Sequence, residues 1–462
     1  MRIAVATPDT LTARMAGPAI RAWQIARALS AEHEVQLVTT TLADLPDAPF
    51  PVRAVDEEGL AELERWCDVL VFQGWLAHKR PFLLDSEKVL VADVYDPLHL
   101  EQLEQGRDEG WRGRALAVQS ATAVLNEQLL RGDFFVCASE KQRDFWLGQL
   151  AALGRVNPVN YDADQTLRSL IDVVPFGVAE APPVRARPAI KGVVPGIGPD
   201  DTVLLWGGGI YNWFDPLTLL HAVDRLRRRR PDVRLFFLGL THPNPDIPEM
   251  RMAVAARELS DRLGLTGTHA FFNEGWVDYE DRQNYLLDAD VGVSTHLDHV
   301  ETAYSFRTRV LDYFWASLPT VATAGDAMGD LIESRQVGLT VPAGDVDALE
   351  AALARLLDDD ELRAAMSVGA GAIAAELTWP RVLAPLVDFC RSPHRAPDLL
   401  EPSVAATLQA DLAEVKERWR GIAYDLRTAA EHLREGGPAL AARKAAGRVK
   451  RVAVTWRDRG PA

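Results

Sequence analysis

The stretch HVETAYSFRTRVLDYFWASLPTVAT, residues 299–323, places a polar and charged opening directly before a strongly apolar run. The apolar residues of VLDYFWAS recur at helical spacing, and LPTVAT is a short segment that predicts a strand. The polar opening has two interpretations. It is either a phosphate-and-sugar site at a strand-to-helix turn or the solvated face of a helix. Features elsewhere in the sequence are needed to distinguish the two interpretations.

The opening of this stretch carries its cations where an isolated helix disfavours them. Ser305 or Thr302 is a candidate helix cap, with the first-turn N–H groups left to point at a ligand. Arg307 and Arg309 fall in that first turn, where the helix dipole opposes cations unless an anion joins them. The alternative is a surface pair between Arg309 and Asp312 at i, i+3, worth about 0.2–0.5 kcal/mol.

The composition is that of a globular protein with more than one domain. The chain has 462 residues, of which 48% are hydrophobic and 25% charged, so two domains and an additional segment are expected. A formal net charge of −16 argues against nucleic acid as the main partner, because a phosphate backbone requires a basic surface. One local basic pocket for a small phosphorylated ligand remains compatible with that charge.

The cysteines and the N-terminus indicate a cytoplasmic protein. Cys67, Cys137 and Cys390 are far apart, each in an apolar neighbourhood, which is typical of reduced, buried cysteines rather than disulfides or a metal cluster. The N-terminal run MRIAVATPDT is too short for a signal peptide. Apolar segments stay well below the ~18 residues of a membrane-spanning helix.

The order of segments predicts two parallel sheets. Strand-like runs begin with RIAVAT and EVQLVTT and continue with CDVLVFQG, KVLVADVY, FFVCASEKQRDFWLGQL and IDVVPFG. Helical segments such as IRAWQIARALSAEH separate them, which favours a parallel sheet with right-handed crossovers. After the Pro/Gly/Ala-rich AEAPPVRARPAIKGVVPGIGPDD the pattern restarts with TVLLWGGG, VRLFFLGL, HAFFNEGW, ADVGVSTH and GLTVPA.

We therefore predict an α/β protein with two Rossmann-like, doubly wound domains facing each other across a cleft, plus a helical tail. The predicted boundaries are 1–180 for the first domain, 181–202 for the linker, 203–377 for the second domain, 378–395 for a closing helix and 396–462 for the tail. Residues 441–462 hold seven Lys or Arg and one Asp. This stretch is either a basic membrane-surface element or a solvated or partner-bound helix.

Three consecutive glycines, Gly207 to Gly209, end the first strand of the second half. Their free N–H groups can cradle a phosphate, although a tight structural turn explains them as well. Asp215 and Pro216 then form a strong helix start. Because a carboxylate at that helix end repels a diphosphate, the phosphate-binding cations are expected elsewhere.

Polar groups of the first half follow its strands. Gly17 precedes a helix starting near Pro18 and allows close approach of a ligand, and Arg21 lies one turn further on. ADVYDPLHLEQLE sets several polar groups just past a strand end, where they suit acceptor binding or proton handling; they are Asp93, Tyr95, Asp96 and His99. The alternatives are an unremarkable surface residue for Arg21 and a loop or structural histidine for His99. The cluster THLDHVE lacks the partner set of a metal site, and no metal is expected.

The domain order, the linker, the closing helix and the opening stretch resemble the GT-B-fold glycosyltransferases of the large retaining family four, over about residues 1–393. That family carries two Glu separated by seven residues before an apolar helix and a strand. LDYFWASLPTVAT matches its second half, with Asp312 for the second Glu and Phe306 for the aromatic residue. Tyr304 stands in place of the first Glu, and Glu301, three residues earlier, is the candidate for its sugar contact.

A second departure from the family concerns a conserved cationic pair. GGGIYNWFDP lacks the family's Arg and Lys, and members with the first departure often carry a basic residue at the position of Arg309. NEGWVDYEDRQNYLLDADVGVSTH resembles the segment in which backbone groups, here near Trp276 and Val277, hold the nucleotide base.

The resemblance implies transfer of a sugar from a nucleotide diphosphate sugar, with retained configuration and without metal, to a glycan or lipid-linked acceptor of cell-surface polysaccharide or glycoconjugate biosynthesis. The implied partners are the nucleotide sugar and the acceptor. A peripheral membrane contact is expected separately, from the basic stretch 441–462. A sugar-nucleotide epimerase of the same fold and a non-catalytic nucleotide-sugar-binding or scaffold protein are the alternatives.

The candidate residues fall into three groups. The catalytic candidates are Glu301, Arg307, His99 and Asp96. The acceptor-side candidates are Arg21, Asp93 and Tyr95. The donor-binding candidates are Gly17, Gly208, Gly209, Trp276, Val277, Tyr304, Ser305, Phe306, Arg309 and Asp312.

Overall fold

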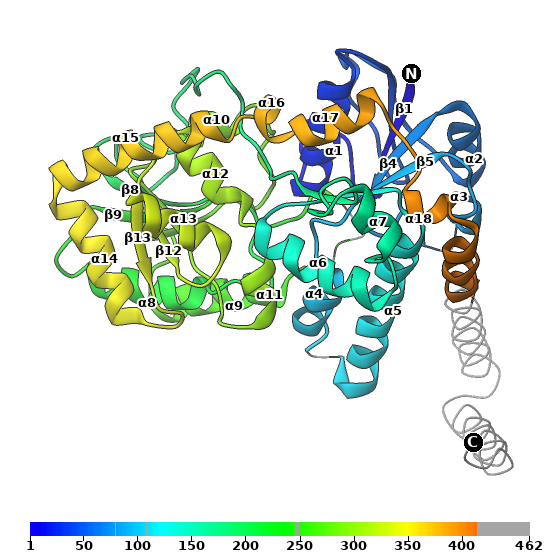
Figure 1. Cartoon of the computed structure of the whole chain (residues 1–462). Coiled ribbons are helices and arrows are strands. Elements are labelled where there is room, and N and C mark those ends of the chain that lie inside the picture. Colours follow the sequence, from blue (N-terminus) through cyan, green and yellow to red (C-terminus); the bar gives the residue numbers. More distant parts are fainter. Residues whose placement is uncertain (79, 108, 245–246, 248, 414–462) are drawn as a thin grey trace, which may run out of the picture. The chain divides into compact units, whose positions relative to one another are not determined.

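Two parallel sheets and their covering helices make up the structure, a computed structural model that describes residues 1–78, 80–107, 109–244, 247 and 249–413 (Figure 1). One compact unit, Met1–Pro402, holds both sheets, and the second unit is Ser403–Ala462. Residues 402–413 are helical.

The first sheet has, within the described residues, seven strands in the order β3-β2-β1-β4-β5-β6-β7. Every neighbouring pair is parallel, and β1 lies between β2 and β4, with Ile3 opposite Val35 and Val69. Near-continuous apolar runs such as VLVFQ form these strands because both faces of a parallel sheet are covered. The strands are β1 Arg2–Thr7, β2 Glu34–Thr39, β3 Val52–Ala54, β4 Val69–Gln73, β5 Val89–Asp93, β6 Phe134–Cys137 and β7 Ile171–Val173.

The second sheet has, over the same described part of the chain, six parallel strands in the order β10-β9-β8-β11-β12-β13. The strand order reverses direction beside β8, as it does beside β1 in the first sheet, and ligands of doubly wound sheets bind at such switch points. The strands are β8 Thr202–Trp206, β9 Val233–Phe237, β10 Ala270–Phe272, β11 Val291–Ser294, β12 Thr320–Thr323 and β13 Gly338–Val341.

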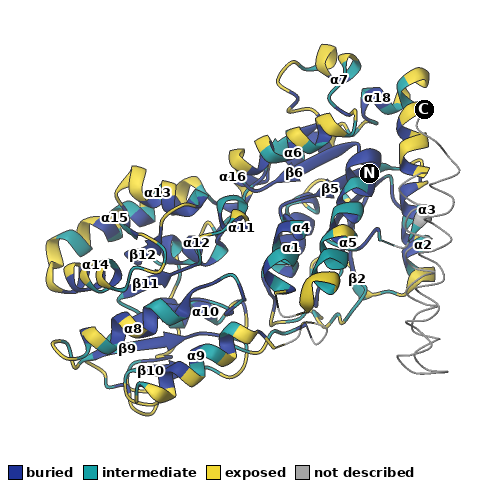
Figure 2. Cartoon of the chain, turned by 90° about the horizontal axis from the view of Figure 1, so that it is seen from below, coloured by how far each residue is buried: buried dark blue, intermediate teal, exposed yellow. Residues whose placement is uncertain are grey.

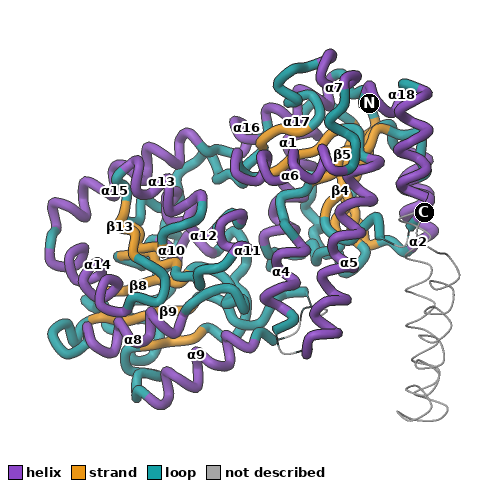
Figure 3. The backbone as a smooth tube through the Cα atoms, turned by 60° about the horizontal axis from the view of Figure 1, so that its bottom comes forward, coloured by secondary structure: helices purple, strands orange, loops and turns teal. Residues whose placement is uncertain are grey.

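Helices cover both sheets, and their outward faces are exposed while the strands are buried (Figures 2 and 3). The helices are α1 Gly17–Leu29, α2 Glu57–Trp66, α3 Pro81–Leu84, α4 Leu98–Gln105, α5 Gly110–Arg131, α6 Glu140–Ala152, α7 Pro158–Ala163, α8 Pro216–Leu226, α9 Arg251–Arg262, α10 Arg282–Leu286, α11 Val300–Tyr304, α12 Thr308–Trp315, α13 Ala327–Arg335, α14 Val346–Asp358, α15 Asp360–Glu376, α16 Trp379–Val382, α17 Ala384–Arg391 and α18 Pro397–Leu400.

The predicted strands and their parallel order are confirmed except in FFVCASEKQRDFWLGQL, where only Phe134–Cys137 is a strand and Glu140–Ala152 is helix α6. The segment between the sheets, residues 179–201, contains neither helix nor strand. The three cysteines are free and buried, as expected. None of the helices in the described ranges is long and apolar enough to cross a bilayer. The basic stretch 441–462 lies outside the described residues, so its membrane interpretation stays a prediction.

The prediction of a single closing helix over residues 378–395 is wrong in one respect. The segment forms two helices, α16 and α17. Pro385 lacks an N–H group and cannot continue the hydrogen-bond ladder of α16, so the chain restarts at Ala384. Both helices pack on α1 (Figure 1). The rings of Phe389 and Phe134 stack with their centroids 4.4 Å apart. The segment therefore returns from the second sheet to the first.

A buried ion pair fixes the chain beyond α17 to the first sheet. The guanidinium of Arg155 donates to both oxygens of Asp398, at 2.7 and 3.1 Å, and neither residue is exposed. Its Nη1 donates to the carbonyls of Leu129, Leu130 and Gly132. This pair is satisfied on every side, so loss of one partner leaves a buried, uncompensated charge.

We expect Asp398→Asn to lower the free energy of unfolding by about 3–5 kcal/mol, the usual effect of breaking a buried pair from one side. Urea denaturation measures the change. The matched control is Glu32→Gln, which breaks the exposed pair between Glu32 and Arg391 of α17. An Asp398 variant as stable as this control would contradict the structural role of the pair.

Candidate functional site

The loops that follow the strands at their carboxyl ends bring the two sheets into contact. The N–H group of Tyr279 donates to the carbonyl of Ala13 at 2.8 Å, and Trp276 Nε1 donates to the carbonyl of Met15 at 3.1 Å. Gln142 Nε2 donates to the carbonyls of Tyr95 and Tyr304, both at 2.7 Å, and so connects one loop of each half. The candidate residues of both halves therefore face a common region.

The opening stretch does not form one helix from Ser305 onward, and the predicted caps are wrong. His299 caps the short helix α11 by accepting from Thr302 N. Ser305 instead donates its hydroxyl to the Glu301 carboxylate, and Thr302 donates to the carbonyl of Leu297 at 2.8 Å. The chain then bends, and α12 begins at Thr308 with Arg307 in the cap position and no side-chain cap.

Glu301 and Arg307 bind each other. Arg307 Nη2 lies 3.1 Å from Glu301 Oε2, and its Nε lies 3.5 Å from Asp326 Oδ2. Both members of the pair are buried, and the positive charge of Arg307 is shared between two carboxylates. Arg307 therefore has less charge left for a ligand than its position in the sequence suggests.

Arg309, unlike Arg307, has no carboxylate partner among the described residues. Its Nη2 donates to the carbonyl of Gly209 at 2.7 Å, and its guanidinium lies 4.1 Å from the ring of Phe214 and 4.4 Å from that of Trp206. The residue is 8% exposed, Nη1 has no partner, and within the described residues no carboxylate forms an ion pair with it. Burial lowers the pKa of Arg309 to about 10, so it remains a cation at neutral pH.

The glycine turn beside Arg309 is built for close approach. Gly208 has φ +91°, a conformation that side chains rarely adopt, and a Cβ there would meet open space. The hydroxyl of Tyr313 accepts from Gly207 N at 2.7 Å and donates to the carbonyl of Val293, which fixes the turn. A Cβ on Gly209 would lie 3.2 Å from the rings of Trp276 and Tyr211.

Two helix N-termini near this turn differ in their capping. Asp215 caps α8, as predicted, by accepting from Thr218 N at 3.0 Å. A carboxylate therefore occupies that end. The first turn of α12 has no side-chain cap. Val310 N donates to the carbonyl of Arg307 at 3.0 Å, which leaves the N–H groups of Thr308 and Arg309 for an anion.

Asp312 pairs with a residue that no sequence pattern indicated. Its Oδ1 accepts from Arg282 Nε at 3.1 Å, and the Arg282 guanidinium lies 3.7 Å from the ring of Tyr279 and 4.7 Å from that of Trp315. The alternative surface pair between Arg309 and Asp312 is therefore wrong. Local spacing gave no signal for Arg282, because it lies thirty positions before its partner on another helix.

On the first sheet, Arg21 and Asp93 form a second buried pair. Arg21 Nε and Nη2 donate to the two carboxylate oxygens of Asp93 at 2.6 and 2.9 Å, and Nη1 donates to the carbonyl of Pro175. The guanidinium lies 5.0 Å from the rings of Tyr95 and Phe176. The charges of these two acceptor-side candidates therefore neutralise each other, and the pair positions the loop after β5.

Asp96 and His99 follow in that loop. Burial raises the pKa of Asp96 to about 7, and the carboxylates of Asp93 and Glu301 add to the shift. Burial lowers the pKa of His99 to about 4, so the imidazole is neutral at pH 7. His99 stacks on Phe145 with ring centroids 5.4 Å apart, and its Nδ1 has no hydrogen-bond partner.

The remaining donor-side candidates lie in the same region. Gly17 begins α1, and Phe306 stacks on Phe176 at 6.1 Å. Tyr304 packs against Phe145 at 4.7 Å, and Val277 packs against the core.

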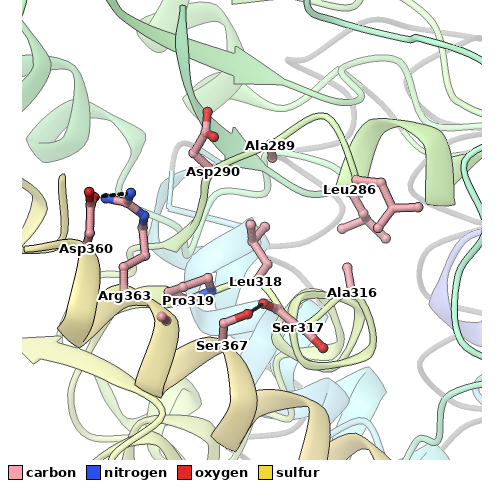
Figure 4. A pocket seen from close by; sticks show the side chains of 12 residues that line it. Leu286, Ala289, Asp290, Ala316, Ser317, Leu318, Pro319, Asp360, Arg363 and Ser367 are labelled. Atoms are coloured by element: carbon pink, nitrogen blue, oxygen red, sulfur yellow. Dashed lines mark hydrogen bonds and ion pairs between the residues drawn. The ribbon is translucent and has the colours of Figure 1, made fainter. Parts of the chain in front are cut away.

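A recess of about 320 Å³ lies elsewhere, at the amino ends of β11 and β12 (Figure 4). Asp290 and Pro319, which immediately precede those strands, line it together with Arg363 and Ser367 of α15. Arg363 is paired with Asp360, and Ser367 donates to the carbonyl of Ser317 at 2.6 Å. Because doubly wound sheets bind ligands at their carboxyl ends, this recess is not the donor site.

Comparison with known proteins identifies the second half of the chain. Residues 201–359 match the family described as glycosyl transferases group 1. The chain carries a domain similar to that family over these residues. It is thus a glycosyltransferase that takes its sugar from a nucleotide sugar, and the predicted GT-B fold is confirmed.

Three relatives illustrate the similarity. The glycosyltransferase is 28% identical over 326 residues to D-inositol 3-phosphate glycosyltransferase of Saccharomonospora viridis, covering 67% of this chain and 73% of the relative. It is 28% identical over 169 residues to phosphatidyl-myo-inositol mannosyltransferase of Mycolicibacterium smegmatis, covering 37% and 39%. The structure of Anabaena HepE in complex with UDP and glucose has a TM-score of 0.60 at 14% identity, covering 85% of this chain and 100% of that one.

The raised pKa of Asp96 predicts a pH-dependent stability. Between its ordinary pKa of 3.8 and the folded value of about 7, the folded glycosyltransferase binds more protons than the unfolded chain. The free energy of unfolding therefore falls as the pH rises through this window, at about 1.4 kcal/mol per unit of pKa shift. We expect Asp96→Asn to remove this loss, so that its stability relative to wild type increases from pH 4 to pH 7.

Urea denaturation of both proteins across pH 4–8 measures the difference. Asp144→Asn, at an exposed position of α6, controls for the chemical change itself. A difference between Asp96→Asn and wild type that stays constant or shrinks as the pH rises would contradict the assignment.

Proposed function

We propose that this glycosyltransferase uses a uridine diphosphate sugar and binds its diphosphate between the glycine turn, Gly207–Gly209, and Arg309. The observation that carries the proposal is the buried guanidinium of Arg309, which has a free N–H group and no ion-pair partner among the described residues. A buried cation without a counter-ion is costly, and a diphosphate supplies the missing negative charge. The HepE complex with UDP supports the choice of nucleotide.

The remaining donor contacts follow from this placement. The uncapped first turn of α12 directs N–H groups at the same anion, while the α8 terminus is closed by Asp215. The base lies against the backbone near Trp276 and Val277, and Asp312 contacts the ribose. Glu301, held in place by Arg307 and Ser305, contacts the transferred sugar.

The chemistry is stabilisation of the leaving diphosphate. As the bond from the anomeric carbon to the phosphate oxygen breaks, negative charge develops on the diphosphate, and Arg309 and the α12 N–H groups neutralise it. The acceptor hydroxyl attacks from the same face, so the configuration at the anomeric carbon is retained, as in retaining members of the family. Fixed donors in a recessed position need little reorganisation when this charge appears.

The acceptor is a glycan or a lipid-linked glycan, and the pathway is cell-surface polysaccharide or glycoconjugate biosynthesis. The relative named as a phosphatidyl-myo-inositol mannosyltransferase supports a lipid-linked acceptor. The proposed location is the cytoplasmic side of the membrane, with residues 441–462 as the contact. Liposome binding by the full chain and by a chain lacking these residues tests that part separately.

We expect Arg309→Met to weaken UDP binding roughly ten- to hundredfold, because a hydrogen bond to a charged group contributes about 1.5–3 kcal/mol. Binding of uridine, which has no phosphate, should not change. The UDP affinity of Arg309→Lys should fall between the affinities of wild type and Arg309→Met, since lysine keeps the charge but not the planar geometry. Isothermal titration calorimetry of each protein with UDP and with uridine measures these affinities.

Arg335→Met, on the exposed face of α13, is the control. Unchanged UDP affinity in Arg309→Met, or an equal loss for UDP and uridine, would contradict the proposed diphosphate contact. A product formed from the nucleotide sugar in the absence of any acceptor would instead indicate an epimerase, and no UDP release with any donor and acceptor would indicate a binding protein.

A further inference from the structure

The side chain of Gln142 joins the loop after β5 to the end of α11. Gln142 lies in the first turn of α6 and is 1% exposed, and its Nε2 donates to the carbonyls of Tyr95 and Tyr304, both at 2.7 Å. Its Oε1 accepts from Ala138 N, also at 2.7 Å. Because a backbone N–H can only donate, Oε1 must face Ala138, and both hydrogens on Nε2 are committed to the two carbonyls.

The start of α6 requires only part of this arrangement. Ser139 caps the helix by accepting from Gln142 N at 3.1 Å, and a Gln three residues after a Ser cap is the pattern of a capping box. In a capping box the Gln contributes its side-chain oxygen alone. The two bonds from Nε2 therefore serve another purpose, which is to hold together segments that follow β5 of the first sheet and β11 of the second.

Each of the two carbonyls adjoins a group that is a candidate for the chemistry. Tyr95 immediately precedes Asp96. Tyr304 immediately precedes Ser305, whose hydroxyl donates to the Glu301 carboxylate. Since one amide nitrogen holds both carbonyls, it sets the spacing between the backbone beside Asp96 and the backbone that orients Glu301.

Aromatic packing on α6 repeats the connection about one turn further along. The ring centroid of Phe145 lies 4.7 Å from that of Tyr304 and 5.4 Å from that of His99. His99 belongs to α4, directly after the loop that holds Tyr95, and Tyr304 ends α11. One face of α6 therefore contacts the same two regions twice, through a hydrogen-bonded amide and through stacked rings.

We infer that Gln142 is a positioning residue for sugar transfer, which aligns the acceptor hydroxyl beside Asp96 with the sugar at Glu301. The inference rests on the proposed function, which places the transferred sugar at Glu301. Transfer requires two bound reactants whose reacting atoms are held about 3–3.5 Å apart, so a change in the spacing of the two segments slows it. Attack by water needs no bound acceptor and is less sensitive to that spacing.

Gln142→Glu and Gln142→Met test this role in the full-length chain. Glutamate keeps an acceptor for Ala138 N but has no N–H group to donate to the two carbonyls. Methionine keeps the length of the side chain without the hydrogen bonds. The matched control is Gln149→Glu, the same change on the same helix, because the Gln149 amide donates to Asn126 Oδ1 within the first half at 2.7 Å.

The measurements are the Kd of UDP by calorimetry and the rates at which UDP-glucose, UDP-galactose and UDP-N-acetylglucosamine are transferred to octyl glucoside or hydrolysed by water. We expect both Gln142 variants to lower kcat for transfer about tenfold or more, because a misplacement of about 1 Å can lower a rate a hundredfold. Hydrolysis should fall less than transfer. The Kd of UDP and the KM of the donor should stay at their wild-type values, as should every parameter of Gln149→Glu.

An unchanged kcat for transfer in both Gln142 variants would overturn the inference. Equal losses of transfer and hydrolysis, or a Kd of UDP that rises together with the loss of kcat, would overturn it too, because a general loss of structure produces these results. Failure of the proposed function gives a different outcome. The wild type would then transfer from another nucleotide sugar, such as GDP-mannose, and the same variants would be compared with that donor.

Discussion

A buried guanidinium without a carboxylate partner is the constraint on which the rest of the site depends. Arg309 lies against the rings of Phe214 and Trp206, with one hydrogen bond to Gly209 and its pKa lowered to about 10 by burial. Such a charge persists only where the surrounding structure holds it or a ligand completes it. The glycine turn, the uncapped start of α12 and the two flanking rings all lie where a diphosphate would complete it.

The other charged groups of the region are arranged so that they do not compete for this role. Arg21 forms an ion pair with Asp93, and Arg282 forms one with Asp312. Arg307 forms ion pairs with both Glu301 and Asp326. Each of these pairs links different elements, and together they hold the loops at the carboxyl ends of both sheets. Because these three arginines are paired with carboxylates, the positive charge proposed to bind the donor is concentrated at Arg309.

The sequence predicted the architecture well because alternating apolar strands and helices leave few alternatives for a parallel sheet. It also predicted the Asp215 cap, since Asp followed by Pro is a local signal. The bend between α11 and α12 was missed because it depends on Ser305 binding Glu301 rather than capping. Asp312 with Arg282 and Arg21 with Asp93 were missed because pairing across distant elements leaves no local pattern.

The most direct test of the central claim is the free energy of unfolding of wild type and Arg309→Met, each measured without ligand and with saturating UDP. If Arg309 is an uncompensated buried charge, the Met variant is the more stable protein without ligand. UDP at a hundred times its Kd then adds about 2.7 kcal/mol to the wild type and much less to the variant. A ligand-free Met variant less stable than wild type would mean that the guanidinium is already satisfied, and would contradict the account.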